Sequence, residues 1–428
     1  MTGPSAVRDA LPRLATTRFA SEDAVLLQGA LHSRRLVLLK SLLTRLERLP
    51  DALPPPARED FERHWLLLER AERSDPAALR TTLGYPAVGS WLTQTLAAPP
   101  GPGWEQLVGH FGAVAAGAAL RAGIVFRTFL AAPDGTLALP GLGVLHPQEP
   151  RFRLAAGPHT VRITVPGRRA AHVLTRRGGR LSPAGPPWQA VPPLPGSPAV
   201  LDDLDPYRAP RTGVGGESLP AGERTTAERE LWQRRWREAL RLMASADPER
   251  VAETSALLRC LVPLARPDHR AVAADAQQAS ATLRSAPGAV LATVPATAED
   301  LADVLVHELQ HSKLAVLADL APLHRAGPEA AYEVPWRPDP RPFDGVLHGT
   351  YAHLALADFW LRARDRPGAT ADQRAAAGAR HERCHDQVSR TLPIVLGSGQ
   401  LTCTGREFAV RMRTHHQSLG RSRGAARH

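Results

Sequence analysis

The chain has 428 residues, of which 43% are hydrophobic and 22% are charged. These fractions are typical of globular proteins and exclude a wholly disordered chain, and the length is natural for two or three domains. The formal net charge of +11 would by itself favour an anionic partner such as nucleic acid. The basic residues are spread along the chain, however, and no nucleic-acid-binding motif accompanies them. A nucleic-acid partner is therefore not expected.

The three cysteines, Cys260, Cys384 and Cys403, are far apart and odd in number. Such usage argues against a disulfide framework and fits a reducing compartment. The first 20 residues lack the continuous apolar segment of a signal peptide. The most apolar stretch, residues 112–132, is broken by two arginines and falls short of a membrane span. The sequence therefore predicts a cytoplasmic protein that does not bind a membrane.

The first 122 residues have the spacing of amphipathic helices. Leucines recur at helical intervals over residues 21–49, and Pro50 ends that segment. Further helices are predicted over residues 59–72 and 104–122. This part of the chain is therefore expected to be mostly helical.

The pattern changes to short strands after residue 122. Apolar and polar residues alternate over short segments that are separated by Pro and Gly, which predicts a small antiparallel sheet within residues 123–182. Residues 183–222 are rich in Pro and Gly and are the best candidate for a linker. The predicted strands are residues 124–130, 152–154, 160–165 and 171–175.

Residues 223–428 begin with a new helix signal, in which Thr225 and Glu228 can form a capping box. A strand is expected within residues 255–264 and a hairpin over residues 280–294. From residue 298 onward the pattern is almost entirely helical. The expected helices are residues 298–321, 345–364, 369–391 and 404–417.

These patterns predict an α+β fold that is predominantly helical. A helical region with a small β-rich subdomain would come first, followed by a linker and a helical domain with a small hairpin. The boundaries are residues 1–122, 123–182, 183–222 and 223–428.

One motif in the C-terminal domain carries recognisable chemistry, His307-Glu308-Leu309-Gln310-His311. It lies in a segment that is helical by pattern, with Thr297 and Asp300 as a capping box ahead of it. Residues four apart share one face of a helix, so both imidazoles can bind one metal ion. The alternative is a pair of solvated histidines on a surface helix. The apolar neighbours favour a buried helix, in which unpaired His and Glu side chains would be costly.

Two histidines do not complete a metal site. The metzincin form requires Gly and His where this chain has Leu314 and Leu317, which excludes it. The gluzincin form takes a Glu from a following helix, and residues 334–381 contain no Glu. The best third ligand is His348, at the start of the next predicted helix, and His353 is the second choice. The alternative for His348 is a histidine bonded to the backbone at a helix start.

A proline-rich stretch, residues 334–342, lies between the motif and the next helix. Its prolines exclude a helix or a central strand, so we expect an extended segment. Its two arginines, Arg337 and Arg341, could bind a carboxylate through bidentate hydrogen bonds. A structural pairing with Asp339 and Asp344 is equally compatible with the sequence.

Taken together, these segments resemble a known family, the HExxH-containing peptide-modification proteins found beside ribosomally made precursor peptides. The resemblance covers roughly residues 225–420, and we find none for the first 220 residues. The matching motifs are His307-Glu308-x-x-His311 with Lys313-Leu314, Pro335-Trp336-Arg337-x-Asp339-Pro340-Arg341-Pro342, Leu347-His348-Gly349-x-Tyr351 and Leu401-Thr402-x-x-Gly405.

The resemblance implies an Fe(II)- and 2-oxoglutarate-dependent peptide β-hydroxylase whose substrates are a precursor peptide and O2. His307, His311 and His348 would then hold the iron, although the usual set is two His and one carboxylate. Arg337 or Arg341 would bind the far carboxylate of 2-oxoglutarate. The catalytic residue on the motif is Glu308. It is rotated by about 100° from its neighbour on the helix, so it is expected to orient a histidine or water rather than bind the metal.

Two other functions stay open at the level of the sequence. In a zinc metallopeptidase, Glu308 would be the general base, and the same three histidines would hold the zinc. In a non-catalytic binding protein, the metal site would be degenerate and the basic surface would contact an acidic partner. In either enzyme, an edge strand of the hairpin could pair with an extended peptide, and the N-terminal 200 residues could recognise it.

Overall fold

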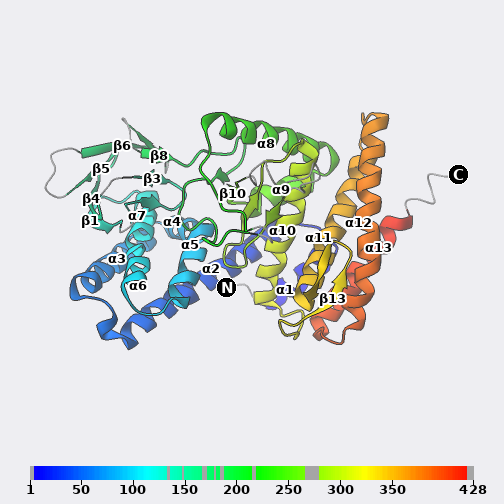
Figure 1. The fold of residues 1–428 in the computed structure, drawn as a ribbon, viewed down its shortest axis with the longest axis horizontal. Helices are drawn as coiled ribbons and strands as arrows, with labels where there is room; N and C mark the ends of the chain where they lie inside the picture. The colour runs from blue at the N-terminus through cyan, green and yellow to red at the C-terminus, as the bar shows by residue number, and fades with distance from the viewer. Residues whose placement is uncertain are drawn as a thin grey trace.

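The computed structural model describes residues 4–132, 135–146, 149–165, 171–177, 180–183, 188–214, 218–265 and 279–421. Helices dominate and several small sheets accompany them, so the fold is α+β and predominantly helical, as predicted. The N-terminal helices and their sheet lie at one end of the molecule, and the C-terminal helices lie at the other (Figure 1). Within the described ranges, no helix has the length and apolar character needed to cross a bilayer.

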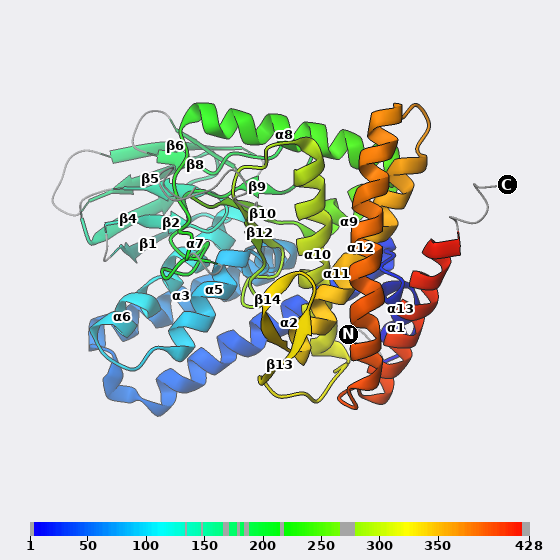
Figure 2. The ribbon, with the colours of Figure 1, turned by 45° about the vertical axis from the view of Figure 1, so that its right-hand side comes forward.

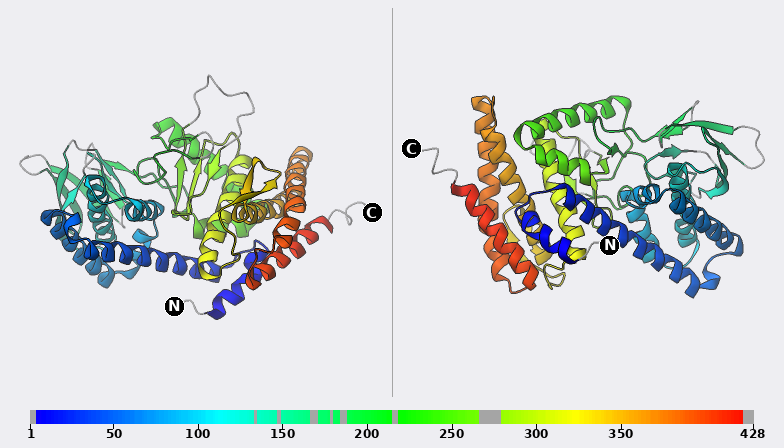
Figure 3. Two further views of the ribbon diagram at one scale, coloured as in Figure 1. Left: turned by 60° about the horizontal axis from the view of Figure 1, so that its bottom comes forward. Right: turned by 180° about the vertical axis from the view of Figure 1, so that it is seen from behind.

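The N-terminal helices confirm the long leucine-rich segment. Helix α2 (Ser21–Arg48) begins beside the C-terminal helices and runs to the end of the molecule that holds the N-terminal helices and sheet (Figure 3). Helix α3 (Pro55–Ser74) follows it. The predicted helix over residues 104–122 is two helices, α6 (Pro102–Gly109) and α7 (Phe111–Arg121). The short helices that were not predicted all begin with proline, which is favoured at the first helical position. They are α1 (Pro4–Ala15), η1 (Pro50–Ala52), α4 (Pro76–Leu83), α5 (Pro86–Ala97) and α9 (Pro248–Leu257).

A five-stranded antiparallel sheet follows these helices, with the strand order β1-β4-β5-β6-β7. One face is buried and carries Phe152, Leu154 and Ile163, whereas the other face carries exposed arginines. The small antiparallel sheet predicted from the alternating pattern is therefore confirmed. Its strands are β1 (Phe126–Ala131), β4 (Arg151–Ala156), β5 (Thr160–Thr164), β6 (Ala171–Arg177) and β7 (Arg180–Pro183).

The stretch predicted as a linker contributes strands to two other sheets. Strand β8 (Trp188–Ala190) completes a three-stranded sheet with β2 (Leu137–Leu139) and β3 (Gly143–Leu145). Strand β9 (Val200–Leu201) pairs in parallel with β10 (Cys260–Pro263). The described part of this Pro- and Gly-rich stretch thus joins the N-terminal sheets to the C-terminal half.

The predicted hairpin is confirmed, and it belongs to a larger mixed sheet. Strands β11 (Ser280–Ala281) and β12 (Ala289–Ala292) are antiparallel, while β12 runs parallel to β10 in the order β11-β12-β10-β9. Gly288 closes the turn with φ of 88°, a conformation that favours glycine. Strand β11 is therefore the edge of this sheet.

The C-terminal helices occur where the pattern places them, and both predicted capping boxes are present. The backbone N–H of Glu228 donates to the Thr225 hydroxyl (3.3 Å), and that of Asp300 donates to the Thr297 hydroxyl (3.1 Å). A hairpin of β13 (Ala330–Val334) and β14 (Arg337–Pro342) forms the proline-rich extended segment. The helices are α8 (Thr226–Ala246), α10 (Ala298–Leu320), α11 (Phe343–Asp365), α12 (Ala371–Gly397) and α13 (Cys403–Arg421).

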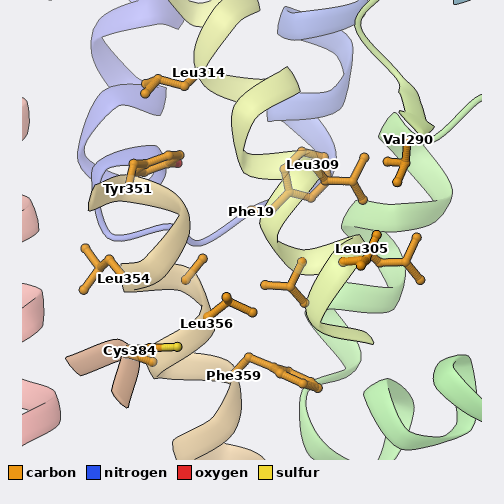
Figure 4. Close-up of a cluster of buried hydrophobic side chains, with 14 of the residues drawn as sticks. Phe19, Val290, Leu305, Leu309, Leu314, Tyr351, Leu354, Leu356, Phe359 and Cys384 are labelled. Carbon is orange, nitrogen blue, oxygen red and sulfur yellow. The ribbon is translucent and has the colours of Figure 1, made fainter. Parts of the chain in front are cut away.

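A core of buried apolar side chains holds α10 against α11. Leu305 and Leu309 of α10 pack with Leu354 and Phe359 of α11, and Val290 of β12 closes one side (Figure 4). Each buried Leu or Phe contributes roughly 1.5–3 kcal/mol by leaving water. Helices α10, α11 and α12 lie side by side in the rotated view, and α8 crosses their upper ends (Figure 2). This packing fixes the two helices that carry the candidate site.

Candidate metal centre

Helices α10 and α11 bring four histidines together. His307 and His311 lie on α10, and His348 and His353 lie on α11. The His307 ring lies beside that of His353, with centroids 5.1 Å apart, and the His311 ring lies beside that of His348, at 5.6 Å. Both residues that the sequence offers as a third ligand therefore lie at the motif, at opposite ends of the histidine pair.

The spacing within the motif suits a shared metal ion. The Nε2 atoms of His307 and His311 are 3.0 Å apart. Two imidazole nitrogens that bind one ion at about 2.1 Å lie roughly 3.0–3.4 Å from each other at ordinary ligand angles. On the other side, Nδ1 of His311 lies 3.4 Å from Nδ1 of His348.

Burial keeps all four imidazoles neutral at pH 7. It lowers the pKa of His307 and His311 to about 3, and that of His348 and His353 to about 4. Neighbouring imidazoles lower the pKa of the two α10 histidines further, because a second positive charge there would be repelled. A neutral imidazole has a nitrogen lone pair, which is the form that binds a metal.

The ring orientations define which histidines are ready to act as ligands. Among the described residues, no three His, Cys, Asp or Glu side chains are arranged around one point. At the candidate centre, His311 directs one ring nitrogen to His307 and the other to His348. His353 donates its Nδ1 hydrogen to the Gly349 carbonyl (2.7 Å), so its Nε2 has the lone pair. The donor chemistry fits Fe(II) or Zn(II), and a third ligand requires one α11 imidazole to rotate.

A carboxylate that the sequence analysis did not assign to the metal lies beside these rings. Asp344 is one turn before His348 on α11, and its Oδ1 lies 3.7 Å from His348 Nε2 and 3.0 Å from His324 Nε2. The guanidinium of Arg284 lies 3.9 Å from its other oxygen. The i, i+4 spacing of Asp344 and His348 was the available signal. Asp344 therefore lies between His348 and His324, with one carboxylate oxygen near a ring nitrogen of each.

Glu308 is engaged by the edge strand rather than by the histidines. Its carboxylate is buried and accepts hydrogen bonds from the Ser280 hydroxyl on Oε1 (2.7 Å) and from the Thr282 hydroxyl on Oε2 (2.8 Å). Ser280 is in β11, and Thr282 follows that strand. Glu308 therefore fastens the hairpin to α10.

The predicted carboxylate-binding arginines lie on a hairpin strand that contacts α11, and the Arg341 side chain lies beside Gly345 of that helix. Arg337 and Arg341 lie on β14, and Arg341 pairs with Asp339 at 3.4 Å, which was the structural alternative. Neither contacts the four histidines through a described hydrogen bond. Trp336, in the turn before β14, does reach the site, because its indole stacks on the His353 ring at 4.5 Å.

The HExxH pattern occurs a second time in this chain, at His381-Glu382-Arg383-Cys384-His385 on α12, which the sequence analysis overlooked. There the His385 ring stacks face to face on His416 at 4.0 Å, and the two motif rings are 5.6 Å apart, compared with 4.7 Å for His307 and His311. The motif rings of this second pattern are thus farther apart than those of His307 and His311, whose Nε2 atoms lie 3.0 Å from each other. The sequence pattern alone therefore does not define the site.

No protein-family model matches this chain, and no curated protein matches it significantly. The function is therefore argued from the residues of the site.

Proposed function

We propose that this chain is an Fe(II)- and 2-oxoglutarate-dependent hydroxylase that acts on a β-carbon of a ribosomally made peptide, like the HExxH-containing proteins that it resembles. One observation carries the proposal. The three central motifs of that resemblance, which lie on three different elements, meet at the histidines. His307 and His311 come from α10, His348 and Gly349 from α11, and Trp336 covers His353.

The residues have distinct parts in this proposal. His307 and His311 would hold the iron, with His348 as the third ligand and His353 as its alternative. When bound, Fe(II) with 2-oxoglutarate supplies the O2 chemistry of hydroxylation. Arg337 and Arg341 are the sequence-based candidates for the far carboxylate of 2-oxoglutarate. Arg284 joins them, because its guanidinium lies beside Asp344 at the His348 end of the cluster.

The contacts of Glu308 favour an oxygenase over a zinc peptidase. A peptidase base must reach the attacking water and take its proton. Both carboxylate oxygens of Glu308 instead accept hydrogen bonds from the hydroxyls of Ser280 and Thr282. A hydroxylase needs no protein base at this position, so a Glu that only positions the strand is compatible with it.

Succinate formation tests the proposal. Protein purified without oxygen would receive Fe(II), 2-oxoglutarate, a candidate precursor peptide and then O2, with Zn(II) as the control metal. We expect succinate that depends on iron, and its loss in His307→Ala. The matched control is His381→Ala, which removes the first histidine of the second HExxH pattern and should leave succinate formation intact.

The outcomes separate the candidate functions. If the zinc form cleaves peptides and the iron form makes no succinate, the protein is a peptidase. If neither form reacts and His307→Ala leaves the metal content unchanged, the binding-protein alternative gains support.

A further inference from the structure

A groove lined by several arginines lies far from the histidines, between α3 and the sheet edge at β1. Both elements are at the N-terminal end of the molecule (Figure 2). The groove encloses about 270 Å³ and takes its lining from α3, β1 and β4. The lining residues are Arg63, Leu66, Leu67, Arg70, Arg127, Thr128, Phe129 and Arg153.

Four of these lining residues are arginines, and the charge of three is not neutralised within the described ranges. Arg63 pairs with Asp60 at 2.6 Å, and no described carboxylate pairs with Arg70, Arg127 or Arg153. Arg127 and Arg153 lie on the same exposed face, because Arg153 is opposite Phe129, two residues from Arg127 on β1. The groove therefore favours a ligand with more than one negative charge.

Apolar side chains alternate with these arginines. Leu66 is 58% exposed although it is large and apolar, and Phe129 lies between the two strand arginines. The strand itself is the edge of its sheet, and His64 of α3 contacts the Phe129 carbonyl at 2.8 Å. An extended peptide presents side chains in alternation, so acidic and apolar residues two apart would match this lining.

The lining fits a peptide better than a nucleic acid. Binding of unpaired bases uses open aromatic faces. Phe129, the one aromatic residue of the lining, already has the Arg151 guanidinium over its ring at 5.0 Å. A groove of about 270 Å³ holds a few side chains.

We infer that this groove binds an acidic, extended segment of the peptide substrate, held by Arg127 and Arg153 with Leu66 as the apolar contact. This inference rests on the proposed function, because it takes the partner to be the modified peptide. The groove and the histidines lie in different halves of the chain, so the segment bound here is separate from the residue that reacts.

Fluorescence anisotropy with the full chain tests the inference. The probe is a fluorescein-labelled 12-residue peptide of three Glu-Ser-Leu-Ser repeats, in which Glu and Leu are two residues apart and share one face. The comparison peptide, the Lys-Leu peptide, has Lys in place of each Glu. We expect the acidic probe to bind, and the double variant Arg127→Glu/Arg153→Glu to weaken its binding by about tenfold or more. The matched control, Arg241→Glu/Arg411→Glu, has the same change in net charge at exposed positions of α8 and α13, outside the groove, and should change the affinity by no more than about threefold.

Several results would overturn the inference. The first is that the acidic probe does not bind. The second is that the control variant loses as much affinity for the probe as the groove variant does. The third is that the Lys-Leu peptide, or a 12-nucleotide single-stranded RNA, binds more tightly than the acidic probe. His307→Ala should bind the probe as the wild type does. Probe binding by a protein that makes no succinate would leave the groove established and reject the hydroxylase.

Discussion

The indole of Trp336 lies against the Cα atom of Gly349, so close that a methyl group at this position would overlap the ring. The tryptophan is in the turn between β13 and β14, and the glycine is near the start of α11. The same indole stacks on His353, whose Nδ1 hydrogen bonds to the carbonyl of Gly349. Gly349 therefore lets a side chain from the hairpin fix the orientation of a histidine at the candidate centre.

Gly349→Ala is expected to displace the indole and to destabilise the protein. Overpacking of this kind costs typically 1–3 kcal/mol, because the added methyl group forces the backbone or the ring to move. The free energy of unfolding from urea denaturation measures the loss.

A double-mutant cycle with Trp336→Leu shows whether the clash is the cause. The smaller side chain should relieve the overlap, so the double variant should be more stable than the sum of the two single effects predicts. If the two effects were additive, the loss of stability in Gly349→Ala would not come from a clash with the Trp336 indole.

Removal of both motif histidines should abolish tight metal binding. His307→Ala/His311→Ala takes away the two nitrogens that are 3.0 Å apart, whereas His381→Ala/His385→Ala removes the second HExxH pair. Elemental analysis after loading with Fe(II) or Zn(II) should find the metal in the second variant and not in the first. Equal metal contents in the two variants would contradict the assignment of the centre to α10 and α11.

Glu308→Gln is expected to weaken the attachment of the hairpin and to retain part of the iron-dependent turnover. The amide still accepts one hydroxyl hydrogen bond, and loss of a bond to a charged acceptor costs about 1.5–3 kcal/mol. Ser280→Ala/Thr282→Val removes the two donors and should produce a similar loss in unfolding free energy. If Glu308→Gln abolished turnover while fold and metal content were unchanged, Glu308 would be a proton-transfer residue.

The buried carboxyl group of Asp205, which is not part of the candidate metal centre, is expected to make the free energy of unfolding depend on pH. Burial, and the nearby Asp202 carboxylate, raise the pKa of Asp205 to about 7. The folded protein therefore holds a proton on Asp205 that the unfolded chain releases near pH 4, so the contribution of Asp205 to stability falls as pH rises between about 4 and 7, by up to ~1.4 kcal/mol per unit. Above pH 7 the effect is constant. The contribution of the buried neutral histidines has the opposite sign, because their pKa values are lowered.

Urea denaturation at pH 5 and pH 7 would measure this dependence. Asp205→Asn has no carboxyl group to titrate, so the unfolding free energy of the wild type relative to that of Asp205→Asn should fall by up to ~1.4 kcal/mol per pH unit over this interval. Parallel curves for the two proteins would contradict the assignment to Asp205. The hydrogen bond that the backbone N–H of Tyr207 donates to Asp205 can be kept by the amide oxygen.

The local pattern of the sequence was sufficient for most of the helices and for the main antiparallel sheet. Leucine spacing placed α2, and the capping boxes placed the starts of α8 and α10, because these signals depend on residues a few positions apart. Helices α4, α5 and α9, which begin with proline, were not predicted. The mixed sheet of β11, β12, β10 and β9 was only partly predicted. The pairing of β9 with β10 joins segments about 60 residues apart in the chain, and a local sequence pattern gives no information on such a pairing.

The sequence by itself determined that His307 and His311 share one face of a helix, since helical geometry fixes that relation within one turn. Only the tertiary structure decided which partners they meet. The packing of apolar faces brings His348 and His353 to this pair and places Trp336 on His353. It also places the Glu308 carboxylate where it accepts a hydrogen bond from Ser280 of β11 rather than from a histidine. The same packing distinguishes this HExxH pattern from the one at His381. These contacts join residues that are distant in the sequence, and their energies depend on how whole helices pack rather than on any local pattern.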